Sequence, residues 1–263
     1  MLVGNAARII AASSVVAMEK MIPAAPSDLP RRSTPLGPPS LLTHLWLPSL
    51  ALWVLSYWLM ARAGDQWLAD ALYRVQGGQW RWQDAWLTEQ LLHRGGRIAS
   101  VIAGLGVIIA AVRAWRGGAR AWRWPLTTLA TSIVLSTALV SRLKAWTQVD
   151  CPWDLLRYGG DRPLRGLFEA SHASEGAACF PAGHASAGYA WVGLYFFARA
   201  TYPSRRWAGL AIGLSAGMLF GFCQQLRGAH FLSHDLWTLA LCWGVALLLF
   251  RRMPGAASPE ATA

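Results

Sequence analysis

The sequence predicts an all-α, polytopic membrane protein built as a bundle of six transmembrane helices. Hydrophobic residues make up 54% of the chain, charged residues only 14%, and the mean hydropathy is positive, which is typical of membrane proteins. Six apolar runs of about 14 to 18 residues occur, and flanking aromatic and small residues extend them toward the length of a membrane helix. A soluble bundle of six buried helices is the alternative, but soluble helices would have polar faces, which these runs lack. The runs are Leu45–Ala61, Ile98–Val112, Trp124–Ser141, Ala185–Ala198, Trp207–Cys223 and Leu236–Phe250.

The segments outside the runs define the remaining organisation. Residues 1–40 are rich in Ala, Pro, Ser and Arg and are predicted to be a disordered tail, as is the segment 253–263. Residues 41–252 form the predicted membrane domain. Within it, residues 62–97 alternate charges with tryptophan, leucine and tyrosine, which predicts one or two amphipathic helices on the membrane surface or against the bundle. Residues 144–184 form a long polar loop between the third and fourth runs.

The basic residues are distributed unevenly between the two ends of the predicted bundle. The net charge of +11 would suit a nucleic-acid-binding protein, but arginines without acidic neighbours collect only in alternate connections. By the positive-inside rule, both termini are cytoplasmic and the mixed-charge loops face outward, toward the periplasm if the membrane is a bacterial inner membrane. The acid-free arginines after the first run are Arg113, Arg116, Arg120, Arg123, Arg199, Arg205, Arg206, Arg251 and Arg252.

The four cysteines divide into two pairs. Cys223 and Cys242 lie inside apolar runs, where cysteine is an ordinary small core residue. Cys151 and Cys179 both lie in the outer loop, where they could form a disulfide in an oxidising compartment or remain free thiols. Closing a loop of 28 residues would stabilise the fold by about 3.5 kcal/mol in the chain-entropy account.

Three polar clusters fall on the predicted outer face. The first is Lys144, one of two lysines in the chain, at the end of the third run. A lone lysine there could simply extend to the lipid headgroups. The second is Pro181-Ala182-Gly183-His184, where backbone amides could meet an anion at a helix start. The third contains Arg227 and His230, followed by Ser233-His234-Asp235, and the three together suit the binding and attack of a phosphate.

The order and spacing of these clusters resemble the type 2 phosphatidic acid phosphatase (PAP2) family, which is related to vanadium-dependent haloperoxidases. The resemblance covers residues 98–250. That family has Lys, six residues, Arg-Pro; then Pro-Ser-Gly-His; then Ser-Arg, five residues, His, three residues, Asp. Here Cys151 replaces the first arginine, Ala182 replaces the serine and Gln224 replaces the second arginine. Asp235 lies five residues after His230, and His234 takes the family's aspartate position.

The resemblance implies a role for each matching residue. Lys144 and Arg227 would neutralise the phosphoryl oxygens, with help from backbone amides at Ala182, Gly183 and His184. His230 would attack phosphorus and form a phosphohistidine, held in the correct tautomer by Asp235 or, as the second choice, His234. His184 would protonate the leaving oxygen and then activate water. Arg157 or Arg162 could supply the charge missing at Cys151.

The implied function is a metal-independent hydrolase of a phosphate monoester or diphosphate on a lipid, without a cofactor. Its expected partners are the lipid phosphate and the bilayer, and no nucleic acid. A phosphotransferase on the same fold and an inactive lipid-phosphate-binding protein are the alternatives. A metal site at His230, His234 and Asp235 is a further one, since the histidines are four residues apart, but the glutamate of a zinc-hydrolase helix is missing.

Overall fold

The computed structural model describes residues 39–165 and 178–254, and within these ranges it contains helices and no β-strand. Most of the two predicted tails and residues 166–177 of the long loop lie outside the described residues. The all-α prediction is therefore confirmed for the part of the chain that the structure describes.

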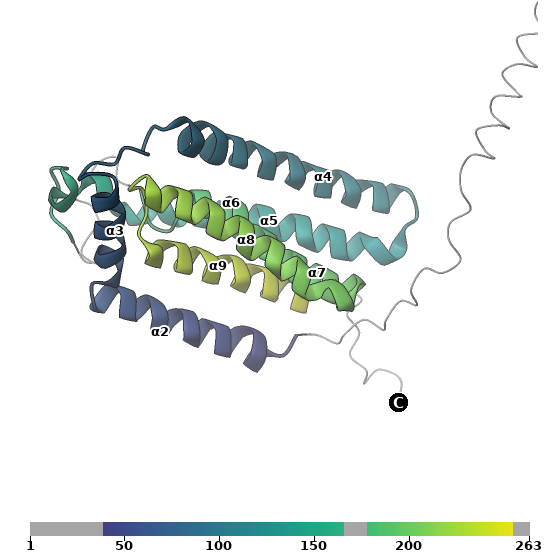
Figure 1. The fold of residues 1–263 in the computed structure, drawn as a ribbon. Helices are drawn as coiled ribbons and strands as arrows, with labels where there is room; N and C mark the ends of the chain where they lie inside the picture. The colour runs from purple at the N-terminus through teal and green to yellow at the C-terminus, as the bar shows by residue number, and fades with distance from the viewer. Residues whose placement is uncertain (1–38, 166–177, 255–263) are drawn as a thin grey trace, which may run out of the picture. The chain divides into compact units, whose positions relative to one another are not determined.

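Within residues 39–165 and 178–254, five helices are long and apolar enough to cross a membrane, which supports a membrane protein. Their axes run roughly alongside one another, and the shorter helix α3 (Gly64–Val75) lies across one end of the group (Figure 1). Large apolar side chains point outward along these helices, as expected for surfaces in contact with lipid. The five helices are α2 (Leu47–Ala61), α4 (Gly96–Arg116), α5 (Arg120–Thr147), α8 (Arg206–Leu226) and α9 (Leu232–Arg251).

The sixth predicted span is helical but interrupted. The run Ala185–Ala198 lies in α6 (Gly183–Tyr189), a 3₁₀ turn (Ala190–Val192) and α7 (Gly193–Thr201). These segments pack against α5, α8 and α9, and Val192 and Phe196 are fully buried among them. The apolar character of this run therefore reflects its central position in the protein, and a count of six spanning helices is not confirmed.

Close packing between α8 and the central segment depends on glycine. Gly209, Gly213, Gly217 and Gly221 recur at every fourth residue of α8 and form one stripe. An added Cβ at Gly209 would approach the Leu194 carbonyl oxygen to 2.6 Å, and one at Gly213 or Gly217 would collide with Val192 or Tyr189. The stripe thus allows the helices to approach closely, as small residues do in membrane bundles. This approach places the end of α8 beside the start of α6.

The segment 62–97 differs from the prediction in its second half. Its first half contains the amphipathic helix α3. From Trp86 onward, however, a π-helical stretch η2 (Trp86–Gly95) continues directly into α4, so that the apolar span covers Trp86–Arg116. The predicted span began at Ile98 because charged residues precede it. As a result, polar residues of η2 and early α4 belong to a membrane helix.

Candidate active site

One cavity of about 820 Å³ brings the three polar clusters together. It lies between α4, α5, α6 and the end of α8, and it extends from a polar end to an apolar end. Predicted site residues that line it are Lys144, Gly183, His184, Arg227 and His230. Further polar residues that line it include His93, Arg97 and Gln224.

His230 is held by a backbone carbonyl. Its Nδ1 lies 2.7 Å from the carbonyl oxygen of Cys179, and because a carbonyl only accepts, Nδ1 carries the proton. Nε2 then holds a lone pair on a ring that lines the cavity. Burial, the neighbouring His234 and the charge of Lys144 hold the pKa of His230 well below its ordinary value. A neutral imidazole of this tautomer is the form that a nucleophile needs.

Asp235 does not take the position that was predicted for it. Its Oδ2 accepts a hydrogen bond from the Gln225 amide at 2.5 Å, and its Oδ1 has no partner among the described residues. His234 donates from Nδ1 to the same Cys179 carbonyl at 2.8 Å and so lies beside His230 without bonding to it. The extra residue after His230 turns Asp235 toward α8, and the Cys179 carbonyl occupies the expected orienting position.

Within the described ranges, no group of three or more His, Cys, Asp or Glu side chains is arranged to hold a metal ion. The spacing of His230 and His234 instead allows both Nδ1 atoms to donate to the Cys179 carbonyl oxygen.

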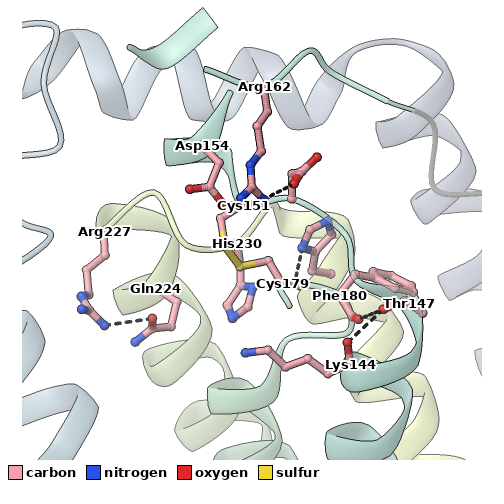
Figure 2. The surroundings of a disulfide bond; sticks show 12 residues. Lys144, Thr147, Cys151, Asp154, Arg162, Cys179, Phe180, Gln224, Arg227 and His230 are labelled. Atoms are coloured by element: carbon pink, nitrogen blue, oxygen red, sulfur yellow. Dashed lines mark hydrogen bonds and ion pairs between the residues drawn. A yellow bond between two sulfur atoms is a disulfide. The ribbon is translucent and has the colours of Figure 1, made fainter. Parts of the chain in front are cut away.

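A disulfide joins Cys151 to Cys179, with the Cα atoms 5.2 Å apart. Figure 2 shows it directly above the His230 imidazole. The Cys179 amide also donates to the Val149 carbonyl at 2.9 Å. The residue that holds both histidines is therefore fixed by a covalent bond and a backbone hydrogen bond.

The Lys144 ammonium points into the cavity and forms no hydrogen bond or ion pair with any residue that the structure describes. Its stem packs on Gly183, where an added Cβ would lie 3.3 Å from the lysine Cδ. Ala182, by contrast, is fully buried, and its amide donates to the His234 carbonyl at 3.4 Å, so the predicted role of that amide in anion binding is not supported.

The two auxiliary arginines lie elsewhere. Arg157 pairs with Asp70, with nitrogen–oxygen distances of 2.5 and 2.7 Å, and Arg162 pairs with Asp150 at 2.6 Å. Neither lines the cavity. The hypothesis that one of them replaces the missing motif arginine is therefore not supported by their positions.

Arg227 lines the cavity but shares its charge with Glu89. An ion pair of 2.5 Å joins them, and Arg227 also donates to the carbonyl oxygen of Gln83 and the side-chain oxygen of Gln224. Its Nη1 lies 2.6 Å from Nδ1 of His93. Glu89, His93 and Arg97 recur at every fourth residue, and that spacing on one helix face is the signal that could have revealed them.

His184 faces this same group. Its ring lies 4.5 Å from that of His93, centroid to centroid, and its buried Nε2 has no hydrogen-bond partner within the described part of the chain. Burial, followed by the nearby His93, lowers the pKa of His184 to about 4. A bound phosphate dianion would raise this pKa again, because an opposite charge favours the protonated imidazole.

A family model described as the PAP2 superfamily matches residues 125–257, just over half of the 263-residue chain. This chain belongs to the PAP2 superfamily. The match covers most of α5 and all of α6 to α9, and hence Lys144, His184, Arg227 and His230, whereas Glu89, His93 and Arg97 lie outside it. Searches of curated proteins and of solved structures gave no match. Membership supports phosphatase-type activity on a membrane-associated substrate for this PAP2 protein.

Proposed function

We propose that this PAP2 protein is an integral-membrane lipid phosphatase that releases phosphate from a lipid monoester or diphosphate through a phosphohistidine. The observation that supports this most strongly is the continuity of the cavity. Its polar end holds the candidate nucleophile and cations, and its other end is an apolar groove between α4 and α5. A substrate with a charged head and a hydrocarbon tail matches both ends.

The groove has the character of a binding site for a hydrocarbon chain. Gly104 leaves room in its floor, since an added Cβ would meet only the Ile133 side chain, at 3.9 Å. The helices on both sides carry exposed apolar residues, so a chain bound there would be continuous with the surrounding bilayer. The apolar lining consists of Val101, Gly104, Leu105, Ile108, Ala130, Ile133 and Val134, with Thr137 beside them.

The chemistry proceeds in two displacements. The His230 Nε2 lone pair attacks phosphorus, a P–N bond forms and the bond from phosphorus to the leaving oxygen breaks. His184, protonated when the phosphate binds, gives that proton to the leaving oxygen. Water then attacks the phosphohistidine while neutral His184 accepts its proton, and the P–N bond breaks to release inorganic phosphate. Lys144 and Arg227 stabilise the charge on the phosphoryl oxygens.

We place the cavity's polar end on the outer side of a bacterial inner membrane, with six crossings and both termini in the cytoplasm. The arginines that lack acidic neighbours support this orientation. Arg116 ends α4, Arg120 begins α5 and Arg251 ends α9, each at the helix end away from Lys144 and His230. The disulfide at the opposite end suits an oxidising compartment.

Phosphate release from a panel of lipid phosphates tests the function. We expect detergent-purified protein to release phosphate from polyprenyl diphosphate, phosphatidate, phosphatidylglycerol phosphate or lipid A phosphate, and to do so at full rate in EDTA. Loss of activity in EDTA would contradict the metal-independent mechanism. Transfer of phosphate to an added lipid, without release, would identify a phosphotransferase, and no reaction with any lipid would favour an inactive binding protein.

The disulfide provides a second prediction, because Cys179 holds His230 through its carbonyl. A Cys151→Ser/Cys179→Ser variant should lose activity about 10- to 100-fold and about 3.5 kcal/mol of stability at most. Activity assays and urea titrations of purified protein measure both. Dithiothreitol should bring the wild type to the level of the variant and leave the variant unchanged, which separates this bond from the thiols of Cys223 and Cys242. Full activity in the reduced wild type would contradict the prediction.

A further inference from the structure

The candidate phosphate site has less positive charge than its cations suggest. Arg227 is paired with Glu89, so the two together contribute little net charge. Cys151, at the position where the family has an arginine, is bonded to Cys179, and both auxiliary arginines are paired with aspartates. Lys144 alone is a weak counterpart for a group with two or more negative charges.

Arg97 is a second cation in the same cavity. It lies one helical turn after His93 in α4 and lines the cavity together with Lys144, His184 and His230. It forms no hydrogen bond or ion pair with the residues that the structure describes. Arg97 is exposed and lines the cavity, so its side chain is available to a ligand there. Its charge also acts on the His184 ring.

The backbone around Arg97 is fixed on both sides. Before it, Gly96 packs so closely on Phe220 of α8 that an added Cβ would lie 2.6 Å from the phenyl ring. After it, the Ser100 hydroxyl donates to the Ala187 carbonyl at 2.7 Å and accepts from the Trp191 indole at 3.0 Å. These contacts hold early α4 against α6 and α8, so the position of Arg97 relative to the candidate nucleophile is well defined.

Arg97 lies where the polar part of the cavity meets the apolar groove. His93 of η2 contacts Arg227 and the ring of His184, Arg97 follows in early α4, and Val101 begins the apolar lining. Arg97 is therefore displaced from His93 by about one helical turn toward the groove. A phosphate attacked by His230 lies near Lys144, so a charge beside Arg97 would lie between that phosphate and the tail.

We propose that Arg97 binds the tail-side phosphate of a lipid diphosphate, and that a diphosphate, rather than a monoester, is the preferred substrate of the proposed phosphatase. His230 then attacks the terminal phosphorus, and the leaving group is the lipid monophosphate, whose phosphate stays paired with Arg97. His184 protonates the bridging oxygen as it leaves. Water completes the reaction, so each turnover consumes one water and yields inorganic phosphate and a lipid monophosphate.

Two substrates that share one tail test this inference, farnesyl diphosphate and farnesyl monophosphate. We expect Arg97→Gln to lower kcat/KM for the diphosphate about 30- to 100-fold, the range for loss of a charge-assisted hydrogen bond, and for the monophosphate less than about 5-fold. Arg97→Lys should recover part of the diphosphate activity. Arg113→Gln, an exposed arginine of α4 outside the cavity, is the matched control and should leave both rates unchanged.

If Arg97→Gln lowers kcat/KM equally for both substrates, Arg97 contacts the transferred phosphate and the diphosphate assignment is wrong. If it lowers kcat/KM for neither substrate, Arg97 does not bind the substrate. Calorimetric binding of farnesyl diphosphate to His230→Ala protein gives a readout without turnover. There, Arg97→Gln should weaken binding of the diphosphate at least about 10-fold more than binding of the monophosphate. If this difference is found in a protein whose wild type hydrolyses neither substrate, the proposed function fails while the Arg97 assignment stands.

Discussion

Replacing His230 with alanine is expected to lower phosphate release at least about 1,000-fold, because it removes the proposed nucleophile itself. The structure supports this choice over the other histidines. The Cys179 carbonyl fixes the proton on Nδ1 of His230 and leaves the Nε2 lone pair at the cavity. Phosphate release from the best lipid of the panel, with the fold monitored by circular dichroism, measures the effect.

His234→Ala is the matched control for this prediction. His234 donates to the same carbonyl but does not line the cavity, so its loss should reduce the rate only about 10-fold, through less precise placement of Cys179. An acid-labile phosphoenzyme should be trapped from ³²P-labelled substrate in the wild type and be missing in His230→Ala. A labelled His230→Ala protein, or one with more than a tenth of the wild-type rate, would show that the nucleophile lies elsewhere.

The site could be predicted from the sequence where the pattern is local. Lys144 ends an apolar run, His184 follows a proline and a glycine, and His230 follows Arg227 by three residues, and the structure brings all four side chains to one cavity. The orienting group could not be predicted, because it is a backbone carbonyl from a different segment. Asp235 was chosen for its residue type, yet its contact is with Gln225. Which way an aspartate points depends on a helix start that spacing alone does not determine.

The fold, too, could be predicted only where the sequence pattern is local. Five apolar spans could be recognised because a membrane helix must be long and apolar, and the described part of the chain contains five such helices. The span begins at Trp86, earlier than predicted. The charged and polar residues in this stretch favoured a helix on the membrane surface, namely Glu89, His93, Arg94 and Arg97. Three of these residues face the cavity or its arginine, where polar side chains are tolerated in a membrane helix. The same charged residues that made this segment resemble a surface helix therefore contribute to the candidate site.

Filling the apolar groove should block long lipids selectively. Gly104→Trp places an indole where the cavity passes between α4 and α5, next to Ile133. Displacing about four methylenes of a bound chain costs about 3 kcal/mol, at about 0.8 kcal/mol each. We therefore expect kcat/KM for a long polyprenyl diphosphate to fall about 100-fold, and that for dimethylallyl diphosphate, whose five carbons end before the block, to change less than about 3-fold.

Gly106→Trp is the matched control, because it adds the same side chain to the same helix but outside the groove. Gly106 lies two residues further along the same helix, is not part of the cavity lining, and has no atom within 4 Å of an added Cβ. Both variants replace a helical glycine with tryptophan, so both make the same change in helix propensity. A loss of kcat/KM that is confined to Gly104→Trp and to the long substrate would therefore show that the groove binds the lipid tail. Equal losses in the two variants would reflect a general disturbance of α4, and unchanged long-chain activity in Gly104→Trp would mean that the tail leaves the site by another route. Since the two substrates share one diphosphate head, the ratio of their rates isolates tail binding from the chemistry at His230.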